Sequence, residues 1–180
     1  MKMKDVTQII AEVDLELELE EVFVSQPSTY VCQVKKDGKS YVLRLRDTNS
    51  SSRREVRNLA IIATMEGTSN MIHCYDPYGD YNVTYLTTFS PGQTLYDSGM
   101  ELSKNLFSRL SAIVRRLHQR GLCGLDLNRS NIVVSPDGER ITFVDLGSCL
   151  LESELSPEDI QRVREEDLRK LENIGYLRKV

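Results

Sequence analysis

The sequence contains neither a long apolar run nor an excess of positive charge. No stretch approaches the roughly 20 apolar residues that cross a membrane. Acidic residues interrupt the N-terminal segment MKMKDVTQIIAEVDLELELE, so we expect neither a transmembrane segment nor a secretory signal. The formal net charge of -4 argues against a nucleic-acid binder, which needs a concentrated basic face. A local basic cluster is interpreted as a solvated surface; it consists of Arg44, Arg46, Arg53, Arg54 and Arg57.

Cysteine and histidine are also sparse. The four cysteines include no C-x-x-C pair, and each lies among apolar residues: Cys32, Cys74, Cys123 and Cys149. This pattern favours buried free thiols in a reducing cytosol over disulfides or a zinc site. We therefore expect a cytoplasmic protein. The two histidines, His73 and His118, are too few for a metal cluster.

The first half of the chain is rich in strand patterns. The whole chain has 180 residues, 40% of them hydrophobic, which is enough for one compact domain with a buried core. EVFV, TYVCQV and YVLRLR have strand character, and the KKDGKS turn predicts a hairpin between the last two. SSSRREVRNLAIIATMEG then carries apolar residues at helical spacing as far as Gly67. MIHCYDP and YNVTYLTTF predict another strand pair.

The second half changes to helical patterns. From Glu101 to Arg120 apolar residues recur every three or four positions, which predicts a long helix that ends at Gly121. NIVV and ITFV, joined by SPDGER, predict a short hairpin. A final acidic helix is expected from about Pro157, and its predicted buried stripe consists of Ile160, Val163, Leu168 and Leu171. This order of elements indicates an α+β protein.

Polar residues flank the short hairpin in a fixed order. Asp126 precedes Asn131 by five residues, and Asp145 follows the hairpin in the triplet DLG. An Asp, an Asn five residues later and a hairpin ending in Asp-Phe-Gly make up the catalytic segment of protein kinases. The chain therefore resembles the protein-kinase-like superfamily, and the resemblance extends over nearly its whole length. From the residues alone, a polar turn that caps a strand remains an alternative for Asp126 and Asn131.

The resemblance implies a minimal two-lobed kinase-like fold, with residues 1–180 in a single domain. A β-rich N-lobe with one helix would cover about 1–88, a hinge about 88–92, and a reduced helical C-lobe about 93–180.

Further residues receive roles from the same resemblance. YLTTFSPGQTL is similar to the segment that joins the lobes, with Thr87 at the gatekeeper position. Thr88 and Ser90 would then offer backbone hydrogen bonds to adenine. YVLRL resembles the strand that carries the phosphate-binding lysine, with Arg44 in its place. Glu55 fits the helix glutamate that pairs with that cation. An exposed edge-strand arginine and a surface helix acid are the alternatives.

The resemblance also implies ATP and Mg²⁺ as cofactors. Asp126 would accept or orient the proton of an acceptor hydroxyl, and Asn131 and Asp145 would hold Mg²⁺ through hard oxygen ligands. The chain has no glycine-rich loop. SQPSTYV stands in its place, where Ser28 and Thr29 would bring N–H and hydroxyl groups to phosphate; a plain β-turn is the alternative.

The C-terminal segment EEDLRKLENIGY narrows the resemblance. It is similar to the ending of small bacterial kinases that act on lipopolysaccharide core sugars. Asp167 would then hydrogen-bond to the catalytic-loop backbone. A solvated helix acid beside Glu165 and Glu166 is the alternative.

The predicted function is that of an enzyme, an ATP- and Mg²⁺-dependent kinase. It would transfer the γ-phosphate to a hydroxyl of a sugar, another small molecule or a protein. The alternative is a pseudokinase that serves as a nucleotide-binding or scaffold module, because Arg44 stands where lysine is expected and the glycines are missing.

Overall fold

The computed structural model describes residues 10–11, 13–14, 16–26, 29–47, 50–76 and 82–175. Besides the helical residues Ile10, Ala11 and Val13, ten strands and four α-helices lie in this part of the chain. In chain order they are β1 (Glu18–Gln26), β2 (Thr29–Lys36), β3 (Lys39–Asp47), α2 (Ser50–Ile61), β4 (Met71–Asp76), β5 (Asn82–Thr88), β6 (Gln93–Thr94), α3 (Leu95–Ser98), α4 (Lys104–Gln119), β7 (Leu122–Cys123), β8 (Ile132–Val134), β9 (Ile141–Phe143), β10 (Leu150–Leu151) and α5 (Pro157–Gly175). Two 3-10 turns, Arg129–Asn131 and Glu152–Glu154, complete the set.

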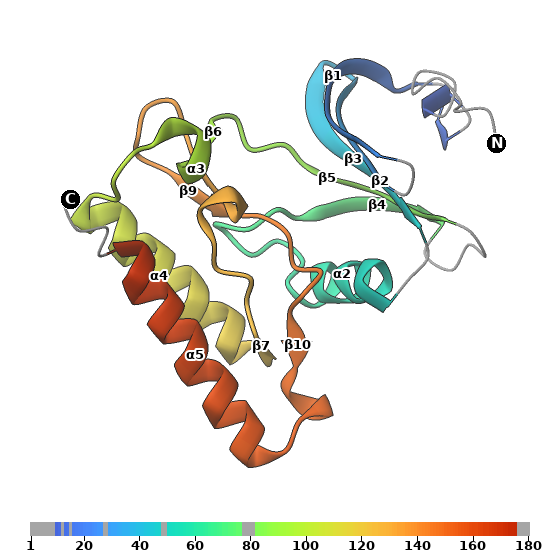
Figure 1. The fold of residues 1–180 in the computed structure, drawn as a ribbon. Coiled ribbons are helices and arrows are strands. Elements are labelled where there is room, and N and C mark those ends of the chain that lie inside the picture. Colours follow the sequence, from blue (N-terminus) through green and yellow to red (C-terminus); the bar gives the residue numbers. More distant parts are fainter. Residues whose placement is uncertain are drawn as a thin grey trace.

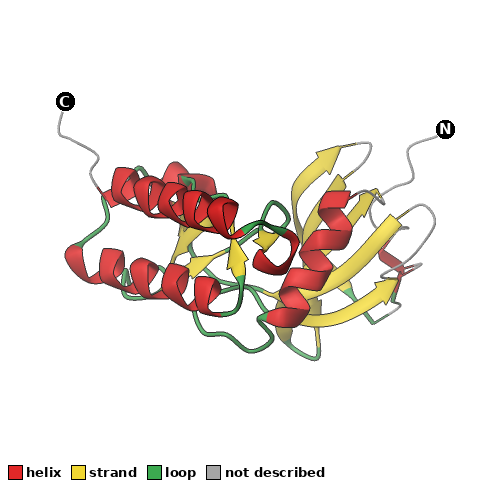
Figure 2. Cartoon of the chain, turned by 90° about the horizontal axis from the view of Figure 1, so that it is seen from below, coloured by secondary structure: helices red, strands yellow, loops and turns green. Residues whose placement is uncertain are grey.

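The first five strands form one antiparallel sheet in the order β1-β2-β3-β5-β4. The predicted β2–β3 hairpin is confirmed: Lys36 pairs with Lys39. Asp37 and Gly38 make the turn, with positive φ angles of 51° and 74°. Asp and Gly tolerate this left-handed conformation, which a two-residue hairpin turn requires. The sheet lies at one end of the molecule and the two long helices at the other (Figures 1 and 2).

The sheet has an apolar core on each face. On one face, Val83 and Tyr85 of β5 join Leu59 of α2 and Ile62, which directly follows that helix, in the main core. On the other face a second cluster forms around Cys32, Val34, Leu43, Leu45 and Leu86, and Ile10 and Leu17 cover it. The sequence did not predict this cover, because acidic residues break up any apolar periodicity in residues 10–20.

Helices α4 and α5 lie side by side (Figure 1), and their buried residues extend the main core beyond the sheet. The predicted helix at 101–120 and the predicted final helix are both confirmed. The expected burial of Leu168 is wrong, since its side chain is 45% exposed. Asp167, Leu171 and Ile174 form the buried face of α5, so Leu168 is rotated about 100° away from it.

The segment between α2 and β4 ties the sheet to the second half of the chain. The N–H of Phe143 in β9 donates to the carbonyl of Gly67 (2.8 Å). Gly67 has a φ of 84°, and a Cβ there would lie 2.5 Å from the side chain of Ile113 in α4. Only glycine fits this close approach without strain. Within the described residues, no helix combines the length and apolar character needed to span a bilayer.

Candidate active site

Asp126 and Asn131 meet on the loop between β7 and β8. The amide Nδ2 of Asn131 donates to the backbone carbonyl of Asp126 (3.0 Å) and to its carboxylate Oδ2 (3.0 Å). Asn128 shapes the loop, because its side chain accepts from the N–H of Asn131 (3.0 Å). With Nδ2 used in this way, the Oδ1 of Asn131 remains as an acceptor for another group.

Asp145 lies directly beside this loop. The N–H of its neighbour Val144 donates to the carbonyl of Asn131 (2.8 Å), which joins the two segments. Asp145 has a φ of 68°, and its Oδ1 accepts from the N–H of Gly147 (3.0 Å). Its other carboxylate oxygen, Oδ2, lies 3.5 Å from Nη2 of Arg46. The structure thus brings Asp126, Asn131 and Asp145 together.

Glu55 of α2 pairs with two arginines of β3. Its Oε1 lies 3.2 Å from Nη1 of Arg44, and its Oε2 lies 2.9 Å from Nη1 of Arg46. Arg44 and Arg46 share one face of the strand because side chains alternate along it. Nη2 of Arg46 also lies 3.5 Å from Oδ2 of Asp145. Arg46 therefore connects the helix acid to the acid beside the loop.

The solvated-surface interpretation of the basic cluster is wrong for its strand members. Arg44 is only 8% exposed and Glu55 only 1%. Burial alone would lower the pKa of Arg44, but the negative charge of Glu55 and the nearby Tyr85 and Asp145 raise it above its ordinary value. Arg44 is therefore a permanent buried cation, paired with a buried anion. Arg57 does lie at the surface, where it pairs with Glu154.

Two residues of this site were not predicted from the sequence. One is Arg46, whose only sequence signal was its position two residues after Arg44. The other is Asn58, one helical turn after Glu55 on α2. Its fully buried amide donates to the carbonyls of Leu146 (2.9 Å) and Cys149 (3.0 Å). Asn58 thus fixes the segment that follows Asp145.

Asp167 of α5 is completely buried and contacts the loop before Asp126. Its carboxylate accepts from the backbone N–H groups of Gly124 (2.9 Å) and Leu125 (2.8 Å). It also contacts Nε2 of His118 at 3.0 Å. Asp167 therefore bonds to the loop backbone, as the resemblance implied. It is not a solvated helix acid.

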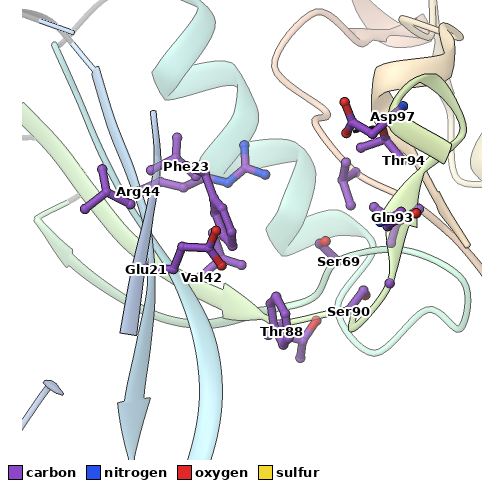
Figure 3. A pocket seen from close by; sticks show the side chains of 16 residues that line it. Glu21, Phe23, Val42, Arg44, Ser69, Thr88, Ser90, Gln93, Thr94 and Asp97 are labelled. Carbon is purple, nitrogen blue, oxygen red and sulfur yellow. Dashed lines mark hydrogen bonds between the residues drawn. The ribbon is translucent and has the colours of Figure 1, made fainter. Parts of the chain in front are cut away.

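A cavity of about 540 Å³ lies next to these groups, a size within the usual range for small-molecule sites. Phe23, Val42 and Arg44 face it from the sheet, whereas Gln93, Thr94 and Asp97 face it from the β6–α3 segment (Figure 3). Val133 and Val144 contribute apolar lining close to Asn131 and Asp145.

Thr88 and Ser90 line this cavity, and their role as a hinge that binds adenine remains a prediction. The N–H of Thr88 is already bonded to the carbonyl of Asn70 (2.9 Å), so it is not available to a ligand as the prediction for Thr88 would need. Thr87 is buried beside Val42, with its hydroxyl 3.5 Å from that residue's carbonyl.

The structure does not place at the cavity the two residues that were predicted to stand in for the glycine-rich loop. Thr29 begins β2, opposite Arg46, and does not belong to the cavity lining among the described residues. Ser28 lies outside the described residues. Both remain predictions.

The groups present fit a phosphate ligand and a hard divalent cation. Nε of Arg44, which lines the cavity, is buried and has no hydrogen-bond partner among the described residues. The phosphate oxygens of a ligand would satisfy such donors. The amide oxygen of Asn131 and the carboxylate of Asp145 are oxygen donors of the kind that Mg²⁺ prefers alongside water and phosphate. Within the described residues, no group of three or more His, Cys, Asp or Glu side chains could hold a metal alone.

Comparison with known proteins identifies the fold. No family model and no curated protein sequence matches the chain. Among solved structures, the kinase domain of BubR1 matches with a TM-score of 0.68 at 14% identity. The match covers 89% of this chain but 61% of the BubR1 domain, so the chain spans less than two thirds of that neighbour. The expected protein-kinase-like fold is thereby confirmed.

Proposed function

We propose that the chain is a small ATP- and Mg²⁺-dependent phosphotransferase with its active site in a cleft between two lobes. The N-lobe would cover about residues 1–88 and the C-lobe about 93–180, with the hinge at about 88–92. In this proposal residues 1–180 form one kinase-like domain.

One observation carries the proposal. The hydrogen bonds that join Asp126 to Asn131, and Asn131 to Val144, gather two acids and an amide at one place. The buried Arg44–Glu55 pair lies beside them, at the edge of a cavity of ligand size. Phosphoryl transfer depends mainly on positioning and on neutralising charge, and this arrangement supplies the groups for both.

Each side chain would have a separate task. Arg44 would bind phosphate oxygens, and Glu55 would hold its guanidinium in place. Asn131 and Asp145 would hold Mg²⁺, which neutralises charge on the phosphates when bound. Asp126 is exposed, so its carboxylate can reach an acceptor. The acceptor oxygen would bond to the γ-phosphorus as the bond to the β-phosphate oxygen breaks. ADP would leave, and Asp126 would take the hydroxyl proton.

The acceptor would be a hydroxyl of a sugar, another small molecule or a protein. A sugar acceptor is supported only by the resemblance of the C-terminal segment to kinases of the lipopolysaccharide-core type. Asp167 in that segment binds the loop backbone at Gly124 and Leu125, as the resemblance to those kinases implied.

A thermal-shift titration with ATP, with and without Mg²⁺, tests the proposal. A ligand that binds only the folded state stabilises it by about 2.7 kcal/mol at roughly 100 times its Kd. Asp145→Ala is expected to remove the metal-dependent part of the shift. Asp126→Ala is expected to keep the shift but lose ATP turnover, measured as ADP release. Glu139→Ala, which removes an exposed acid from the β8–β9 turn, is the charge-matched control.

The second candidate function is a nucleotide-binding or scaffold pseudokinase. The contact of Arg46 with Asp145 favours it, because a cation already sits at a proposed metal ligand. ATP binding that is identical in wild type, Asp126→Ala and Asp145→Ala, with no ADP release from any of them, would support this candidate over the enzyme.

A further inference from the structure

The proposed phosphate site needs one strand cation, yet the chain places two on the same face of β3. Arg44 lines the cavity, whereas Arg46 does not. Arg46 lies further along the strand, where it contacts both Glu55 and Asp145. Its role is therefore different from phosphate binding by Arg44.

The two contacts of Arg46 differ in geometry. Its Nη1 lies 2.9 Å from the nearly inaccessible Glu55, whose side chain is 2% exposed. Its Nη2 lies 3.5 Å from Asp145, whose side chain is 33% exposed. The contact to Asp145 is the longer and more solvated of the two. It can open while Glu55 continues to hold the guanidinium.

We infer that Arg46 is a built-in counter-ion for Asp145, which a divalent cation must displace before it can bind that carboxylate. This inference rests on the proposed function, in which Asp145 is a metal ligand. Two guanidinium groups balance the two carboxylates of Glu55 and Asp145. Asp145 itself therefore offers little surplus negative charge to a free cation, and the third carboxylate of the site, Asp126, lies on the neighbouring loop.

The first test needs no nucleotide. Thermal unfolding is measured in millimolar MgCl₂ and in NaCl of equal ionic strength. Wild type is expected to show little Mg²⁺-specific shift, because Arg46 occupies Asp145. Arg46→Gln is expected to show a Mg²⁺-specific shift of the unfolding temperature, because Asp145 in this variant has lost its counter-ion. Arg46→Gln combined with Asp145→Asn should lose this gain, and Arg46→Lys should behave like wild type because the charge is kept.

The second test measures the Kd of ATP by calorimetry across a Mg²⁺ series. Each series gives the Mg²⁺ concentration at which the change in the Kd of ATP is half complete. In Arg46→Gln this concentration should fall several-fold relative to wild type. Arg57→Gln removes a surface arginine of α2 and should leave that concentration unchanged. Arg44→Gln should weaken ATP binding at every Mg²⁺ concentration.

The two tests separate the inference from the proposed function. Failure of ATP to bind any variant, together with an Asp145-dependent Mg²⁺ shift in Arg46→Gln, would reject the nucleotide site and keep the counter-ion role. If Arg46→Gln gains no Mg²⁺ response, or needs more Mg²⁺ than wild type, the inference is wrong.

Discussion

Arg44 illustrates what one position in a strand pattern can reveal. The resemblance of YVLRL to the lysine-bearing strand of kinases predicted that Arg44 faces the cavity as a cation paired with Glu55. The structure has that pair and that orientation. The alternation of strand side chains puts Arg46 on the same face, but only the three-dimensional position of Asp145 shows what Arg46 contacts. Residues that act through a distant segment are not readable from local spacing.

Asp167 gives the residue-scale prediction. Its two carboxylate oxygens accept from Gly124 and Leu125. In Asp167→Asn one oxygen becomes an amide that cannot accept, so one buried N–H loses its partner. Leaving a buried donor unsatisfied costs about 1–3 kcal/mol. We expect a fall of that size in the free energy of urea unfolding at neutral pH.

A neighbouring acid provides the control for this measurement. Glu166 is exposed and pairs with Arg169 at 2.8 Å on the helix surface. Glu166→Gln should change the unfolding free energy little, because exposed ion pairs contribute little. Equal effects of the two substitutions would contradict the loop-anchoring role of Asp167.

At the scale of elements, local patterns predicted most strands and helices. The β2–β3 hairpin followed from its Asp-Gly turn, and α4 followed from its apolar spacing. Elements whose partners are distant were predicted less well. The burial of Leu168 was predicted wrongly because the actual face of α5 is set by Asp167, a polar residue that an apolar stripe does not include. The site showed the same limit, since Asn58 resembles any polar helix residue.

The N-terminal cover of the sheet leads to a prediction about pH. Asp14 contacts Nζ of Lys36 (2.9 Å) and accepts from the hydroxyl of Tyr75 (3.0 Å). The hydrogen bond from Lys36 is the main cause that lowers the pKa of Asp14 from 3.8 to about 2. A carboxyl whose pKa is lower in the folded state stabilises that state above the ordinary pKa. Its contribution is lost as the pH falls through the folded-state pKa.

Wild type should therefore lose stability between about pH 4 and pH 2 faster than Asp14→Asn. Urea unfolding of both proteins at several pH values in this range measures the difference. The gap between their unfolding free energies should be largest above pH 4 and should close toward pH 2. A difference in unfolding free energy that stays constant with pH would show that the charge of Asp14 does not stabilise the N-terminal segment that covers the sheet.

At the scale of the whole molecule, the two apolar cores share strands. Leu43 and Leu86 belong to the second cluster, which Ile10 and Leu17 cover and which is called the outer cluster from here on. Val83 and Tyr85, from the same strand as Leu86, belong to the main core. Strand β5 therefore contributes to both cores on its opposite faces. Separate unfolding of either core would expose one face of that strand, so the two cores should unfold together.

The free cysteines test this directly, since Cys32 lies in the outer cluster and Cys149 in the main core, both fully buried. Burial raises the pKa of each thiol, which keeps the reactive thiolate scarce until the chain opens.

Two variants, each keeping one of these cysteines and carrying alanine at the other three positions, are labelled with a thiol reagent across a urea series. Both thiols should report the same opening free energy and the same urea dependence, while a variant that keeps only the half-buried Cys74 should react faster. Labelling of Cys32 at a markedly lower opening free energy than Cys149 would mean that the outer cluster opens alone, and the shared strand would then not couple the two cores.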